Sequence, residues 1–523
     1  MNGFPIISVL TFAPLAAALV LIGLGPDQKR LARGISLGAS LVNLILAAGL
    51  WMHFDPGSHD PQFVEQHRWF STVENPDFVQ YYVAVDGLSV LMVLLTALVV
   101  PIAILASWKI EDKVPTFFSL VLFLQSGLFG TFTALNFVHW FIFWEISLVP
   151  AFFLIKLWGG PHRSAAATQF FIYTMVGSVA MLLSFLALYY VTGTFDFFAL
   201  ADKGRSGAIA SEMVVKIGSW QFLNRDQLPL VIFAGAFLGF AVKVPVVPFH
   251  TWLPTTYAEA PTSVTMLLTG LMSKMGVYGF LRILLPIFPD QMRMVLTPLL
   301  WLAVATIVLP ACTAFAQKDL KRMFAYSSIN HLGYCLLGIF ALTKLTRTDS
   351  SWDLERSAVL NGVMLQMFNH GLTAPILFCF IAFLENRSGG LRGVDDFGGL
   401  RKAAPVFCGL MGIAIFASLG LPGLNGFIGE FLIFKGSFAL ATWATTLSVL
   451  GLLVTAVFLL TMVQRVFNGP LNGKWSGLPD LNLKERLLVA PALALMLLIG
   501  VCPQFLIGKI NTTVMAMVEN MKF

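Results

Sequence analysis

Long apolar runs alternate with short polar segments along the whole chain of 523 residues. Runs of about 20 apolar residues have the length that crosses a bilayer as a helix. The pattern predicts an all-α polytopic membrane protein with about fourteen transmembrane helices and no soluble domain. The predicted spans are 5–24, 34–53, 86–106, 116–135, 137–157, 167–192, 229–247, 262–285, 295–316, 322–342, 358–384, 405–436, 440–466 and 486–510.

Two of the apolar runs contain residues that interrupt helices. Pro245 and Pro248 follow Lys243 at the end of the seventh run, and Pro422 lies among four glycines shortly before Glu430 in the twelfth. Non-helical backbone is tolerated at membrane depth only where protein or a water-filled cavity satisfies it. We therefore predict that helices 7 and 12 are broken. An ionisable residue beside each break is typical of an ion site in a transporter built from inverted repeats.

Composition agrees with this pattern, because 57% of residues are hydrophobic and only 11% are charged. The net charge of +6 does not indicate a nucleic-acid-binding protein, since most basic residues lie in short loops after odd-numbered runs. The positive-inside rule then predicts that both termini lie on the outer side, periplasmic or equivalent. We expect a multi-pass protein of the bacterial inner membrane. The two longer outer segments, 54–85 and 193–228, mix acidic and basic residues, and we expect them to be loops.

Among the charged residues within the apolar runs, four stand out as candidates for function: Glu145, Lys243, Lys274 and Glu430. Intramembrane ionisable residues are costly and usually mark ion pathways. Lys243 is the candidate ion-pair partner of Glu145, although a lone carboxyl kept protonated in the core is an alternative. Lys274 lies too near the middle of its run for snorkelling to be the better explanation. Lys435, one turn after Glu430, could pair with that carboxylate or snorkel.

Two histidines lie on polar stripes of predicted helices. His331 has serines at i−4 and i−3, and His370 has Gln366 at i−4 and Thr373 at i+3. Each histidine alone could serve only an interhelical hydrogen bond. Together the two polar stripes would provide the hydrogen-bonding side chains of a hydrated proton pathway between the helices of Lys274 and Glu430.

Five segments together resemble the antiporter-like membrane subunits of complex I, the proton-pumping NADH:quinone oxidoreductase, of the chain M or subunit 4 type. These segments are FWEISLVPAFFLIKLWG, KVPVVPFHTWLP with AEAPTS, LKRMFAYSSINHLGY, NHGLTAPILF and LPGLNGFIGEF. The resemblance covers about residues 85–470. It implies inverted repeats of helices 4–8 and 9–13, with units at 1–115, 116–285, 286–468 and 469–523, the last containing helix 14.

The resemblance also implies the function and the partners. We expect a proton-translocating subunit without redox centres, with FMN, iron–sulfur clusters and quinone bound in partner subunits, and with neighbouring antiporter-like chains beside it. Glu145, Lys243, Lys274 and Glu430 would be proton carriers, and a polar axis would include His331 and His370. The sequence departs from the family at residues 255–257, where Thr-Thr-Tyr replaces the usual Asp-Ala-His.

The expected route takes a proton from the inner side near Lys243 to Lys274, along the two histidine stripes and out through Glu430. One alternative is a subunit of a multisubunit cation/proton antiporter or of a membrane-bound hydrogenase complex. Another is an electron-carrying quinone or haem enzyme, but such an enzyme needs paired axial histidines. The chain has eight histidines, and the two near mid-membrane have different neighbours. Its five cysteines occur singly, so no iron–sulfur cluster or structural zinc is predicted.

Overall fold

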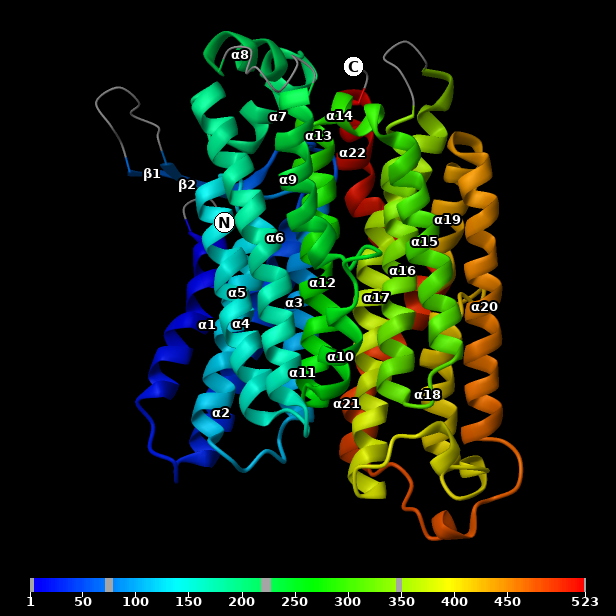
Figure 1. Ribbon diagram of the computed structural model, residues 1–523. Coiled ribbons are helices and arrows are strands. Elements are labelled where there is room, and N and C mark those ends of the chain that lie inside the picture. The colour runs from blue at the N-terminus through cyan, green and yellow to red at the C-terminus, as the bar shows by residue number, and fades with distance from the viewer. Residues whose placement is uncertain (1–3, 71–78, 218–226, 345–349, 522–523) are drawn as a thin grey trace.

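The computed structural model describes residues 4–70, 79–217, 227–344 and 350–521. Its long helices lie side by side in a bundle, with short elements at both ends (Figure 1). Residues 71–78 and 218–226 of the two predicted outer loops lie outside the described residues.

The N-terminal group contains a small sheet that the all-α prediction omitted. Its elements are α1 (Ile6–Ile22), α2 (Lys29–His53), β1 (Gln62–Phe70), β2 (Val79–Val85) and α3 (Gly87–Ala106). The strands pair antiparallel, and their valine, tyrosine and phenylalanine content suits a pleated surface. The Glu65 carboxylate of β1 accepts a 2.8 Å hydrogen bond from the Ile7 amide, which joins the hairpin to the start of α1.

The next group contains two short helices where a loop was predicted. Its elements are α4 (Val114–Thr133), α5 (Phe137–Trp158), α6 (Arg163–Thr192), α7 (Phe197–Arg205), α8 (Ala208–Ile217), α9 (Gln227–Lys243) and α10 (Trp252–Glu259). Thus the predicted loop 193–228 contains α7 and α8, and Asp196 caps α7 by accepting a 2.8 Å bond from the Ala199 amide. The predicted break in span 7 is present, because α9 ends at Lys243 and α10 begins at Trp252.

The eighth predicted span is helical but irregular. It consists of α11 (Thr262–Leu267), the π-helix η1 (Leu268–Met272), α12 (Ser273–Gly279), the π-helix η2 (Phe280–Leu284) and α13 (Leu285–Ile287), followed by α14 (Pro289–Met294). The two π segments correct the expectation of one regular helix over 262–285. Lys274 lies between them, and such π turns occur frequently at functional sites.

The second half repeats the pattern of long helices and one broken span. It comprises α15 (Leu296–Phe315), α16 (Leu320–Leu342), η3 (Ser350–Trp352), α17 (Asp353–Ser388), η4 (Val394–Asp396), η5 (Leu400–Lys402), α18 (Pro405–Ser418), α19 (Asn425–Leu440) and α20 (Thr442–Val466). The break predicted in span 12 separates α18 from α19. Only glycine fits at Gly426, since a Cβ there would lie 1.9 Å from the Ala417 carbonyl oxygen.

The C-terminal span is not the single helix predicted over 486–510. After η6 (Gly473–Trp475), α21 (Leu483–Val501) and α22 (Gln504–Asn520) meet at an angle of 66°. Gly500 packs against the break of span 12, where a Cβ would stand 2.2 Å from the Gly423 carbonyl oxygen. Beyond the bend, α22 contacts α3, because the Gly87 amide donates a 2.9 Å bond to the Thr513 hydroxyl.

Nine helices among the described residues are long and apolar enough to cross a membrane, or ten if α21 and α22 form one span. Three shorter apolar helices, α1, α9 and α18, fall below that length. A multi-pass membrane architecture follows, while a count of fourteen spans does not follow from length and composition alone. Both chain ends lie toward the end of the bundle that carries the hairpin, α7 and α8 (Figure 1).

Candidate functional site

Four of the six predicted site residues form one connected series between the two halves of the bundle. Lys274 of α12 places its Nζ 2.6 Å from Nδ1 of His370 on α17. The rings of His370 and His331 have centroids 5.3 Å apart. His331 of α16 in turn places Nδ1 3.1 Å from Oε1 of Glu430 on α19. All four residues are buried, so the series runs through the interior.

The irregular helix around Lys274 supplies the lysine with oxygen acceptors. The Thr269 carbonyl in η1 accepts a 2.5 Å bond from the lysine Nζ. The Thr269 hydroxyl lies 3.1 Å from the Ser328 hydroxyl on α16. Tyr257, the third residue of the Thr-Thr-Tyr departure, is buried, and its carbonyl oxygen accepts a 3.0 Å bond from the Thr265 hydroxyl.

The break of span 12 provides the space around Glu430. Gln366 donates a 3.3 Å bond to the same carboxylate oxygen that faces His331. Gly420 has a φ of 77°, and a Cβ there would lie 2.6 Å from Glu430 Oε2. A glycine is needed both for this backbone conformation and for the close approach. Lys435 is exposed and does not bond Glu430, so the suggested pairing is wrong.

The other two predicted residues lie apart from this series. Lys243 is the last residue of α9 and is buried, with its Nζ 4.7 Å from the centre of the Trp144 ring. The Trp144 indole donates a 3.0 Å bond to the Ser178 hydroxyl. Glu145 acts on Lys243 electrostatically, but no N–O contact within 4 Å joins them, and its Oε1 has no hydrogen-bond partner. The predicted direct ion pair is therefore absent, and the indole face occupies that position.

The two parts approach each other where α9 ends beside α12. A Cβ at Gly276 would lie 3.2 Å from the Cβ of Lys243, so the backbones are close. Even so, no hydrogen bond joins Lys243 to Lys274 among the described residues. Sequence reasoning missed Trp144, Thr269 and Ser418, whose hydroxyl lies 3.2 Å from His331 Nε2. The sequence signal that could have identified these residues is their position next to a helix break or near a buried charge.

The arrangement suits proton transfer better than metal binding. Lysine, histidine and carboxylate side chains exchange protons, and each consecutive pair here is in hydrogen-bond or ring contact. Within the part of the chain that the structure describes, no group of three His, Cys, Asp or Glu residues could hold a metal ion. The five cysteines are free thiols.

Two sequence models of known families match the chain. A model described as NADH:quinone oxidoreductase/Mrp antiporter, transmembrane, matches residues 134–458. A model of the amino terminus of NADH-ubiquinone oxidoreductase chain 4 matches residues 65–131. The matched regions adjoin each other and include all six predicted site residues.

Similar curated proteins extend over almost the full chain. NADH-quinone oxidoreductase subunit M of Rhodobacter capsulatus is 34% identical over 98% of this chain and 96% of its own length. F(420)H(2) dehydrogenase subunit M of Methanosarcina mazei is 36% identical over 95% of each chain.

Two solved structures show the same fold. A chain of respiratory complex I from Thermus thermophilus superposes with a TM-score of 0.82 at 26% identity, covering 98% of this chain and 99% of that one. A chain of the Mrp complex from Dietzia sp. superposes with a TM-score of 0.81 at 19% identity, covering 99% and 98%.

Proposed function

Because the chain belongs to the NADH:quinone oxidoreductase/Mrp antiporter family, we propose that it is the proton-translocating, non-redox membrane subunit of an NADH:quinone oxidoreductase. Matches to subunit M sequences along nearly the whole chain support this assignment. Flavin, iron–sulfur clusters and quinone would belong to partner subunits. The neighbours in the membrane would include other antiporter-like chains.

The observation that carries the proposal is the buried series from Lys274 to Glu430. A proton on the Lys274 ammonium faces a ring nitrogen of His370 at 2.6 Å. Transfer to His331 needs a reorientation or a water between the two rings, whose centroids are 5.3 Å apart. His331 then faces the Glu430 carboxylate directly, and that carboxylate delivers the proton toward the outer side.

Lys243 and Glu145 would load this series from the inner side. An opposite charge favours the protonated form of a buried lysine, while desolvation favours the neutral form. Movement of the Glu145 charge relative to Lys243 would therefore change how firmly the lysine holds its proton. The cause of this movement would be coupling to electron transfer in partner subunits.

The finer architecture proposed is fourteen spans with two inverted five-helix repeats, helices 4–8 and 9–13. Corresponding packing supports it: α4 packs on α5 as α15 packs on α16, and α6 packs on α9 as α17 packs on α19. Glu145 precedes Lys243 by 243−145 = 98 residues, and His331 precedes Glu430 by 430−331 = 99. The unit boundaries 1–115, 116–285, 286–468 and 469–523 follow from these repeats.

The proposed location is the bacterial inner membrane with both termini outside. The ion pairs of Lys29 and Arg33 with Glu111, and of Arg392 with Asp319, lie in the basic loops that the positive-inside rule assigns to the inner side. Both chain ends lie at the end that carries the hairpin (Figure 1).

A second candidate differs in the electron donor. The Methanosarcina mazei subunit, named for F(420)H(2), is as similar to this chain as the subunits named for NADH. The site residues of this chain carry no feature that binds either donor. The same proton route would serve both complexes, so the donor must be tested directly.

The test is to purify the native complex through a tag on this chain, reconstitute it in vesicles and measure proton uptake with NADH or reduced F(420) as donor. Redox-driven uptake that is lost in Lys274→Ala supports the proposal. Lys435→Ala is the matched control, since this lysine is exposed and lies on the helix of Glu430. Full pumping by an assembled Lys274→Ala complex would remove Lys274 from the route. Co-purification of antiporter-like chains alone, with sodium/proton exchange, would replace the proposal.

A further inference from the structure

Polar side chains continue from Lys274 toward the end of the bundle that holds the chain termini. Lys274, Tyr278 and Arg282 follow one another at intervals of four residues, which places them along one face of the helix. Eight residues of helix cover about 12 Å. A polar column therefore leads from the centre of the axis in the direction opposite to the inner side.

A buried ion pair ends this column. Arg282, in η2, places one guanidinium nitrogen 2.5 and 2.6 Å from the two carboxylate oxygens of Asp86. Both side chains are only 10% exposed. Asp86 is also held by its own helix, since it caps α3 and accepts 3.1 Å bonds from the Leu88 and Ser89 amides. Asp86 and Arg282 are therefore fixed by several contacts each.

Tyr278 lies between this ion pair and Lys274. Its hydroxyl accepts a 3.3 Å bond from Arg282 Nε and donates a 3.0 Å bond to the Phe132 carbonyl. The ring is fully buried and packs edge-on against the Phe132 ring at 5.3 Å. The tyrosine hydroxyl is thus engaged by Arg282 and the Phe132 carbonyl, and Tyr278 stands between Arg282 and Lys274 along the helix.

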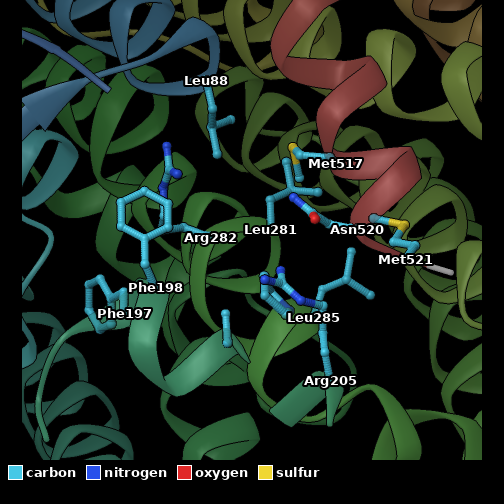
Figure 2. A pocket seen from close by; sticks show the side chains of 12 residues that line it. Leu88, Phe197, Phe198, Arg205, Leu281, Arg282, Leu285, Met517, Asn520 and Met521 are labelled. Carbon is cyan, nitrogen blue, oxygen red and sulfur yellow. The ribbon is translucent and has the colours of Figure 1, made fainter. Parts of the chain in front are cut away.

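A cavity of about 120 Å³ borders Arg282 of the ion pair. Arg282 and Leu88 border it on one side, and Met517 and Asn520 of α22 border it on the other (Figure 2). This volume has room for several water molecules. Residues of α7 and α22 line it, so it belongs to the end of the bundle where the chain terminates.

We propose that Asp86 and Arg282, with Tyr278, form the outer seal of the proton route. This inference rests on the proposed function. A guanidinium cannot release its proton in a protein, and a fixed positive charge repels an incoming proton, as arginines do in other selective pores. The seal separates the water of the cavity from Lys274. Protons on Lys274 must then go on to His370 and Glu430 and cannot return from the outer side along this column.

The experiment measures passive proton permeability of vesicles that contain the assembled complex without an electron donor, alongside redox-driven uptake. Arg282→Met is expected to raise the passive permeability several-fold and to lower net pumping while electron transfer continues. Adding Lys274→Ala should return the permeability to the wild-type level, because the leak passes through that lysine.

Two further variants serve as controls. Arg282→Lys retains a cation and is expected to keep the passive proton permeability low. Arg293→Met removes an outer-end arginine with a looser ion pair, 3.6 Å from Asp290, and is the control.

The results separate the seal from the proposed function. A wild-type complex that does not pump would contradict the proposed function itself. If the wild type pumps and Arg282→Met is equally tight, with or without pumping, the seal is refuted. A leak in Arg282→Lys as large as in Arg282→Met would refute the role of charge. Should Arg282→Met fail to assemble, Asp86→Asn/Arg282→Met leaves no unpaired buried charge and gives the same test.

Discussion

The two halves of the bundle treat their buried charges differently. In the second half, Glu430 is bonded by His331 and Gln366, and the histidine leads through His370 to Lys274. In the first half, Lys243 faces the ring of Trp144, and Glu145 retains an unpartnered oxygen. The second half therefore contains most of a connected series, which begins at Lys274 of the first half, whereas Glu145 and Lys243 of the first half are held apart.

This difference separates two tasks that a pump requires. A connected series can carry a proton but cannot by itself give it direction. A pair of charges whose separation can change alters the affinity of a lysine for its proton. Under the proposed mechanism, Glu145 and Lys243 would control the transfer, and the series from Lys274 to Glu430 would conduct. The following predictions test that division, starting with the largest effect.

Interrupting the connected series should have the largest effect. His370→Leu removes the only side chain that joins Lys274 to His331 in the described structure. We expect redox-driven proton uptake to fall about 100-fold, the lower end of what a positioned proton-transfer group contributes. Vesicle pH measurements during donor oxidation provide the test. His67→Leu, at an exposed position on β1, should pump normally. Normal pumping by assembled His370→Leu would contradict a conducting second half.

Crowding Glu430 should weaken the series without breaking it. In Gly420→Ala, the new Cβ would lie 2.6 Å from Glu430 Oε2 at a φ of 77°, which costs about 1–2 kcal/mol and pushes the carboxylate aside. Proton uptake should fall because the carboxylate moves relative to His331, by less than in His370→Leu. Gly412→Ala on α18 is the matched control, because no neighbour lies within 4 Å of its added Cβ. Equal uptake by the two variants would show that Glu430 tolerates displacement.

Removing the indole face should affect the first half more gently. Trp144→Leu eliminates the cation–π contact of Lys243, worth about 1–2 kcal/mol at a buried site. Fewer protons should be taken up per electron pair, while donor oxidation continues. The loss should be several times smaller than in His370→Leu. Trp144→Phe keeps an aromatic face and should recover most of the loss. If both variants pump fully, Lys243 does not depend on the ring.

The smallest effect concerns the first turn of α18. Burial alone would raise the pKa of the Asp480 carboxyl. Hydrogen bonds from the Val406, Leu481 and Phe407 amides lower this pKa by more, so it lies below its ordinary value. Loss of such a cap costs about 1 kcal/mol. Asp480→Asn should lower the apparent Tm of the complex slightly at neutral pH.

The Tm difference should depend on pH in one direction. A lowered carboxyl pKa stabilises the folded state above the unfolded pKa, and this stabilisation disappears as the pH falls through the folded pKa. Wild type and Asp480→Asn should therefore converge in acid. A difference that persists there would assign the effect to packing rather than to charge.

The sequence predicted the long helices and both breaks, because apolar length and proline or glycine placement act locally. It could not predict the π segments beside Lys274, since they depend on how α11 to α13 pack against other helices. The β hairpin and α7 were missed because their segments are mixed in polarity. The 66° bend after Val501 was missed although Pro503 marks its position.

The structure brings four of the six predicted site residues into one series, and their role in proton transfer stays a prediction. Buried charge identified Lys274 and Glu430, and polar spacing identified His331 and His370. Pairing Glu145 with Lys243 assumed that opposite charges must touch, but Trp144 lies one residue before Glu145 and presents its ring to the lysine instead. Distances between side chains on different helices depend on packing, which no single segment encodes.

The contact of Gly500 with Gly423 has a consequence for biosynthesis. The broken span carrying Glu430 is translated 500−423 = 77 residues before the glycine that packs against its break. While the ribosome makes those residues, the exposed backbone at the break must stay with water, lipid or the insertion machinery. The half-helix that holds Glu430 therefore completes its packing only after a later helix has entered the membrane. A ribosome stalled between the two would leave a chain whose break is still open.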